Sequence, residues 1–338
     1  MAFKIFPRYD KEGPGVYVEE LESRTPTTRF FQVLKIKFWK LSTNNIMHIL
    51  FNLPMILLSI ILVTNIFYAF DFKIDSFVES ILTIQERVPE NQATAPTITD
   101  GEEAEEELPP ITAEEAAAGF YQAAILIVAM FLVGMNLFSV GPVQTGLSYL
   151  YRNYAREIPT FTWSDFKDSF VLNWKSSLKM MLINLTITLL WIFNIYFYQK
   201  MSPFGDIPST IITAIFTVAG FFFLGMNIFI YPMLASLDLK VKHIYKNAAL
   251  FFLSRFFHAI GILIVNVFLL LVIPFLLIFF LNVLGFFILM VYYVLIAFAL
   301  VHYLNTFFAW QQIERFIVKP EEERIEKEKM EAENEAEE

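Results

Sequence analysis

The chain has 338 residues, of which 56% are hydrophobic and 17% aromatic, and its formal net charge is −9. Soluble domains are about 45–50% apolar, so this composition is typical of a membrane protein instead. The absence of cysteine excludes disulfides, thiolate metal sites, cysteine nucleophiles and iron–sulfur clusters. The four histidines have no zinc-site spacing, and we expect no metal and no other cofactor.

The N-terminal segment, residues 1–45, is predicted to be cytoplasmic and to contain an interfacial helix at about 28–41. Its apolar residues recur on one helical face, its tryptophan suits the depth of lipid headgroups, and its basic residues suit anionic lipid. The candidate anchor residues are Phe30, Leu34, Phe38, Trp39 and Lys40. A cleavable signal peptide is not expected, because no apolar region follows until Ile46.

Six apolar runs are each long enough to cross a bilayer as a helix. They are predicted at 46–70, 120–140, 178–198, 211–237, 258–281 and 284–310. The last two are separated by only two residues, which predicts a tight hairpin near Asn282 and Gly285. The fold class predicted is therefore all-α, a polytopic membrane protein with six transmembrane helices.

The basic residues alternate between the segments that separate these runs. Of the 25 Lys and Arg residues, 22 fall in residues 1–45, in the second and fourth connections, and in the C-terminal tail, when Lys179 at the edge of the third run is counted with the second connection. Basic residues accumulate on the cytoplasmic side, so both termini are predicted to lie inside. We expect a multi-pass membrane protein.

Two acidic segments produce the negative net charge. The first acidic segment, residues 71–119, holds thirteen Asp or Glu and forms the first predicted extracytoplasmic loop. The second predicted extracytoplasmic loop is the short segment 199–210, which is not one of the acidic segments. Residues 311–338 form the cytoplasmic tail, with ten Glu in its last eighteen residues. Both segments are interpreted as solubilising regions, and binding of cations or of a partner remains open for each.

Two cytoplasmic loops, 141–177 and 238–257, are each predicted to begin after a proline that ends a span and to contain a short amphipathic helix. In the first loop the aromatic residues lie on one helical face, and in the second the lysines point outward. The candidate partner-docking residues are Trp163, Phe166, Phe170, Asp238, Lys242 and Lys246.

Several chemistries are not supported by the sequence. The segment Gly141–Gly146 has the outer glycines of a phosphate-binding loop but lacks its lysine, so direct ATP binding is not expected. Apart from Lys179 at the start of the third run, no run contains a charged residue, and neither an enzymatic activity nor a nucleic-acid partner is expected. The neutral polar residues of the runs, mostly Asn, are interpreted as interhelical hydrogen-bonding groups, with a sugar-binding cavity as the alternative.

Several short motifs occur in a recognisable order. They are Gly13-Pro14-Gly15-Val16, Arg29-Phe30-Phe31, Phe38-Trp39-Lys40-Leu41, Leu53-Pro54, Gly141-Pro142 with Tyr149 and Tyr151, and Tyr231-Pro232 followed by Lys246-Asn247-Ala248. In this order the chain resembles the YesL-like family of bacterial membrane proteins, with 71–119 as an insertion. The family has no established activity, but the resemblance implies proximity to oligosaccharide importers, because such proteins tend to be encoded beside them.

Together with these features, the resemblance implies a non-catalytic accessory subunit in the bacterial cytoplasmic membrane that docks on the permease of a carbohydrate ABC importer. One alternative is a stand-alone transporter or channel for an uncharged solute. Another is a membrane sensor or assembly factor. The solute, the partner's identity and the oligomeric state do not follow from the sequence.

Overall fold

The computed structural model describes residues 25–71 and 113–337, and every secondary-structure element in these residues is helical. The helices are α2 (Pro26–Ile36), α3 (Phe38–Ala69), α5 (Ala113–Gly134), α6 (Gly141–Ala155), α7 (Thr162–Met201), α8 (Asp206–Leu234), α9 (Val241–Ser254), α10 (Phe256–Val267), α11 (Ile273–Tyr292), α12 (Phe298–Ile313) and α13 (Lys319–Glu337). Three π-helical turns, η1 (Phe268–Val272), η2 (Tyr293–Ala297) and η3 (Glu314–Val318), connect α10 through α13. The all-α class is confirmed for this part of the chain, whereas most of the predicted acidic loop lies outside it.

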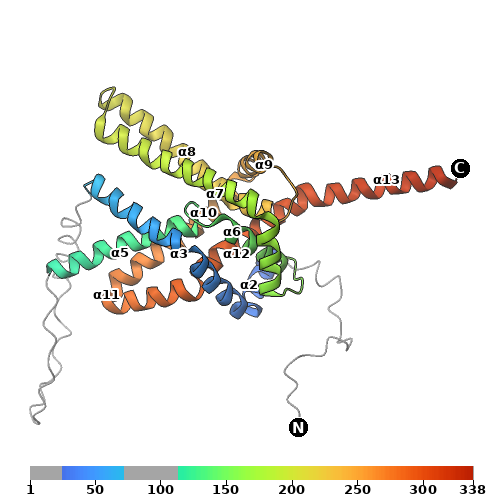
Figure 1. Ribbon diagram of the computed structural model, residues 1–338, viewed down its shortest axis with the longest axis horizontal. Helices are drawn as coiled ribbons and strands as arrows, with labels where there is room; N and C mark the ends of the chain where they lie inside the picture. Colours follow the sequence, from blue (N-terminus) through green and yellow to red (C-terminus); the bar gives the residue numbers. More distant parts are fainter. Residues whose placement is uncertain (1–24, 72–112, 338) are drawn as a thin grey trace, which may run out of the picture.

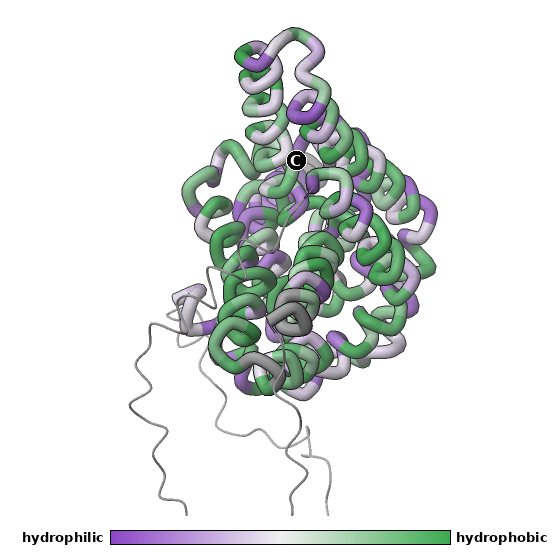
Figure 2. The backbone as a smooth tube through the Cα atoms, turned by 90° about the vertical axis from the view of Figure 1, so that its left-hand side faces the viewer, coloured by the Kyte–Doolittle hydropathy of each residue, from purple (hydrophilic) through white to green (hydrophobic). Residues whose placement is uncertain are grey.

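Five helical segments are long and apolar enough to cross a membrane. They are Phe38–Ala69, Thr162–Met201, Asp206–Leu234, Phe256–Leu281 and Leu284–Glu328. Figure 2 shows hydrophobic residues along most of the helical length, interrupted by hydrophilic turns. These properties support a multi-pass membrane protein.

The predicted second span, 120–140, differs from the structure at its C-terminal end. Helix α5 ends at Gly134, and its described apolar part, Ala118–Gly134, is shorter than the five segments above. Asn136 has a φ of 58°, in the left-handed region that asparagine tolerates at helix ends. The prediction that this helix continues to Val140 is therefore wrong.

Helix α7 joins two elements that the sequence analysis separated. The amphipathic helix of loop 141–177 and the predicted span 178–198 form one continuous helix of 40 residues. At about 1.5 Å per residue its length is roughly 60 Å, about twice the hydrocarbon thickness of a bilayer. It contains neither Gly nor Pro, so no residue within it interrupts helical hydrogen bonding.

The predicted interfacial helix, in contrast, is broken. Residues 28–41 divide at Lys37 between α2 and α3, so the predicted continuous apolar face is wrong. Phe30 packs inward, with its ring stacked on Tyr303 at a centroid distance of 5.0 Å. Phe38 and Trp39 instead are exposed at the start of α3.

The centre of the fold is α6, which the sequence analysis assigned to a loop. Thirteen of its fifteen residues are buried, and it packs against α7, α12, α8, α3 and α2. Gly141-Pro142 begins this helix, as proline favours, and the prediction that it ends a span is wrong. Gly146 lies against the ring of Phe166, which lets α6 and α7 approach closely. Figure 1 shows the α7–α8 pair running from this centre to the upper left, above α3, α5 and α11.

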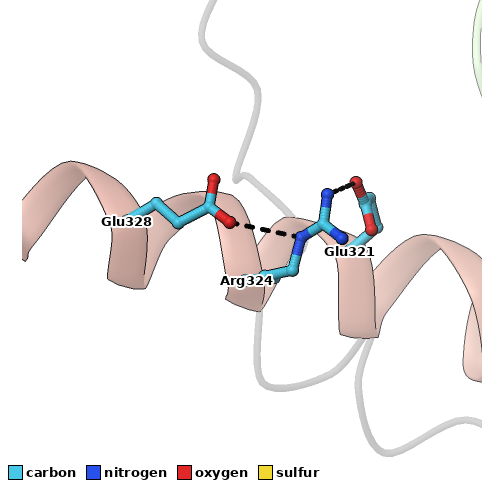
Figure 3. Close-up of polar contacts among 3 residues, drawn as sticks. All are labelled: Glu321, Arg324 and Glu328. Carbon is cyan, nitrogen blue, oxygen red and sulfur yellow. Dashed lines mark hydrogen bonds and ion pairs between the residues drawn. The ribbon is translucent and has the colours of Figure 1, made fainter.

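The end of the chain forms a reversal and then a projecting helix. In α11, Gly285 lies against the backbone of Leu277, so the chain folds back where the sequence predicts a hairpin. Helix α13 extends alone toward the C-terminus (Figure 1). Its Arg324 forms ion pairs with Glu321 and Glu328, at 2.6 and 3.5 Å (Figure 3).

Candidate functional site

The docking residues predicted in the first cytoplasmic loop have different environments. Trp163 is 59% exposed at the start of α7, whereas Phe166 is 3% exposed and packs on Gly146. Phe170 is partly buried against the same core. Phe166 therefore stabilises the packing of α6 on α7 and is not accessible to a partner, and Trp163 is the exposed member of the three.

Other large apolar side chains are exposed just before α7 and along its first turns. We call the group formed by Phe161, Trp163, Leu172 and Trp174 the aromatic patch; all four are at least 48% exposed. It covers the first third of α7, before the predicted span begins at residue 178. Phe51 of α3 adjoins it, with its ring 6.3 Å from that of Trp163.

The docking residues of the second loop lie elsewhere. Asp238, Lys242 and Lys246 are exposed at and before the start of α9. Lys242 lines a groove between α7 and α9 together with Lys179. The structure thus places Lys242 beside the middle of α7, and no described contact joins it to the aromatic patch.

Lys40, one of the candidate anchor residues, and its neighbour Lys37 contact the loop that follows α6. The Nζ atoms of Lys37 and Lys40 donate to the carbonyl oxygens of Ile158 and Thr160, at 3.5 and 3.4 Å. Lys37 also lies over the ring of Tyr154, 4.5 Å from its centroid. Burial lowers the pKa of Lys37, and the positive charge of the nearby Lys40 lowers it as well. The contacts of Lys37 and Lys40 fix the break between α2 and α3. The membrane-anchoring role of Trp39 and Lys40 stays a prediction.

A buried polar centre surrounds α6, and the sequence analysis missed it. The N-terminus of α6 has no cap from its own N-cap residue, Val140. Asn52 of α3 supplies one: its Oδ1 accepts from the Val140 N–H at 2.7 Å and from Gln144 at 3.3 Å. A helix that begins in the protein interior needs such an acceptor, because water cannot reach its first N–H groups.

Further polar pairs join α6 to its neighbours. Ser148 contacts His302 of α12, with 2.7 Å between Oγ and Nε2. Thr145 and Ser177 of α7 lie at 2.7 Å between their hydroxyl oxygens. The polar residues Gln144, Thr145, Ser148 and Tyr151 recur at helical spacing, which was the available signal for a buried helix.

The asparagines of the apolar helices pair with one another. Asn184 of α7 donates to Asn227 of α8 at 2.9 Å and accepts from the Tyr245 hydroxyl at 2.6 Å. Asn266 and Asn305 are paired at 2.7 Å. These contacts match the interpretation of interhelical hydrogen bonding, and the pockets described below involve none of these asparagines.

A basic pocket lies where α2 meets the end of α12. Its cavity has a volume of about 410 Å³ and is lined by Pro26, Arg29, Ala155, Phe307, Trp310, Gln311, Gln312, Glu314, Arg315 and Lys319. Arg29 pairs with Glu157 at 3.8 Å. Three cations against one carboxylate among these residues give the pocket a positive charge.

Comparison with known proteins gives one match. Residues 120–195 match the family described as "Protein of unknown function, DUF624". No curated protein and no solved structure matches the chain. The matched segment contains α6 and the aromatic patch on α7, so it is this central part of the fold that is similar to an uncharacterised family.

Proposed function

We propose that this chain is a non-catalytic membrane subunit that docks through the aromatic patch on a partner membrane protein. The observation that carries the proposal is the exposure of this patch before the predicted span of α7. Exposed large apolar side chains mark interaction surfaces, and aromatic residues are enriched where proteins bind one another. Lysines and aspartates between the aromatic residues, such as Lys167 and Asp168, suit the rim of such an interface.

The partner that we propose is the permease of a bacterial carbohydrate ABC importer. This part of the proposal rests on the resemblance to the YesL-like family and on the genes that accompany such proteins, which is an association and not a physical argument. The pairing of the interior asparagines supports a subunit role over a solute pathway, because their amides are already used between helices.

The orientation belongs to the same proposal. With both termini in the cytoplasm, the aromatic patch, α9 and the basic pocket lie on the cytoplasmic side of the bacterial inner membrane. This orientation requires α5 to complete a sixth crossing, with residues before Ala118 contributing to its length.

Co-expression with the permease pair of a carbohydrate importer from the same organism tests this function. We expect the full chain to co-purify with the permease in mild detergent, and replacement of Trp163 and Trp174 by Ala to reduce the yield at least tenfold. Lys200→Ala, which alters an exposed basic residue at the far end of the same helix, is the matched control. A monodisperse chain without permease, together with solute uptake in proteoliposomes containing this chain alone, would support the transporter alternative instead.

A further inference from the structure

We propose that the groove between α7 and α9 binds one anionic phospholipid, with its phosphate between Lys179 and Lys242. The groove has a cavity volume of about 510 Å³ and is lined by Lys179, Leu182, Ile183, Val241, Lys242 and Tyr245. This inference requires only that the chain is embedded in a membrane, and it is independent of the proposed permease partner.

The walls of the groove suit an acyl chain. Leu182 and Ile183 are 52% and 37% exposed, and both lie about one turn beyond Lys179 along α7. Val241 and the ring of Tyr245 form the opposite side from α9. The hydroxyl of Tyr245 is already engaged with Asn184 at 2.6 Å, so this polar group is satisfied within the protein.

The charges are placed at one end of these apolar walls. Lys179 comes one residue after the start of the predicted span 178–198, and Lys242 is the second residue of α9. Each is exposed, and none of the six lining residues is acidic. Two ammonium groups beside apolar walls complement a lipid that combines a phosphate with hydrocarbon, as do basic pockets between membrane helices.

A lipid fits this groove better than a soluble phosphate. A small phosphate compound would make no contact with Leu182, Ile183 and Val241, whereas an acyl chain packs on all three. A neutral phospholipid would cover them equally but would leave the two lysines without a net counter-charge. The proposal therefore predicts a preference for phosphatidylglycerol over both phosphatidylcholine and glycerol 3-phosphate.

Native mass spectrometry of the full chain, delipidated in detergent and titrated with each of these three compounds, tests the preference. We expect tight retention of phosphatidylglycerol and a loss of about 25-fold in its affinity on replacing Lys179 and Lys242 by Gln, at about fivefold per lysine. The matched control replaces Lys175 and Lys246, exposed lysines on the same two helices that do not line the groove, and should change affinity less than twofold.

A second variant separates charge from shape. Ile183→Trp fills the groove from α7 while both lysines remain, and it should also reduce phosphatidylglycerol retention at least tenfold. Each variant is first checked for a monodisperse elution profile and unchanged helical circular dichroism. Equal loss in the Lys175/Lys246 control, equal retention of phosphatidylcholine, or undiminished binding by Ile183→Trp would overturn the proposal.

Discussion

Replacing Asn45 by Ala should destabilise the protein by about 2–3 kcal/mol. Its Nδ2 donates to the carbonyl oxygens of Tyr293 and Val294 at 2.7 Å each, and its Oδ1 accepts from the Ala299 N–H at 2.8 Å. These backbone groups belong to η2 and the start of α12. Three hydrogen bonds at about 1 kcal/mol each give 3 kcal/mol, and the smaller value of about 0.6 kcal/mol typical of membrane helices gives about 2 kcal/mol.

Reversible unfolding in mixed micelles, followed by tryptophan fluorescence, measures this change. The matched control is Asn65→Ala on the same helix, because Asn65 is exposed and its amide donates only to the carbonyl of Ile61 in its own helix. We expect the control to change the free energy of unfolding by less than about 0.5 kcal/mol. Equal effects of the two substitutions would refute the argument that Asn45 holds the π-helical turn to α3.

Three further predictions use the same unfolding assay. Gly225→Ala adds a Cβ against the buried ring of Phe252 and should lower the free energy of unfolding by about 1–3 kcal/mol. Gly261→Ala, with open space around its Cβ position, should leave the protein equally or more stable. A larger loss of stability for Gly261→Ala than for Gly225→Ala would contradict the packing. Arg152→Met removes a 2.9 Å hydrogen bond from Nη1 to the C-cap carbonyl of α8 and should cost about 1.5–3 kcal/mol, so an unchanged stability would show this link to be weak. Arg324→Ala breaks two exposed ion pairs and should change the free energy of unfolding by less than about 1 kcal/mol, with only a slight loss of helicity in α13. A larger loss of stability would mean that α13 packs against another part of the protein.

The apolar helices could be predicted from the sequence because their length and composition reflect a single physical requirement. A backbone in hydrocarbon must satisfy its own hydrogen bonds over about 20 residues, and five segments meet this condition. The continuity of α7 could also have been predicted, since no Gly or Pro interrupts 162–201. Hydropathy changes near residue 178, but a change of environment along a helix does not end the helix.

Helix α6 could not be predicted in the same way, because its burial depends on distant residues. It is too short and too polar to be a span, and its N-terminus is capped by Asn52, 88 positions earlier in the chain. The break at Lys37 likewise depends on Tyr154 in α6 and on Ile158 just after it. Such contacts decide where helices begin, and sequence periodicity within one segment does not contain them.

The candidate docking surface shows the same limit at the level of single side chains. Trp163 and Phe166 belong to one predicted apolar face, yet only the first is exposed, because Gly146 leaves room for the ring of the second. Helical spacing identifies which residues share a face but not which of them another helix already covers. A partner surface therefore had to be read from burial in the folded chain.

The continuity of α7 connects the two proposed sites. Trp174 of the aromatic patch and Lys179 of the lipid groove are five residues apart, or about 7.5 Å along the helix axis. A lipid phosphate at Lys179 would reduce the positive charge next to the patch, so a partner docked there would meet a more neutral surface in an anionic membrane. The two sites nevertheless use different side chains, because the patch is apolar and the groove depends on Lys179 and Lys242. Substitutions in the aromatic patch should therefore reduce binding of the partner and leave lipid retention unchanged. Substitutions of Lys179 and Lys242 should reduce lipid binding directly, and they should change partner binding only through the charge of this segment.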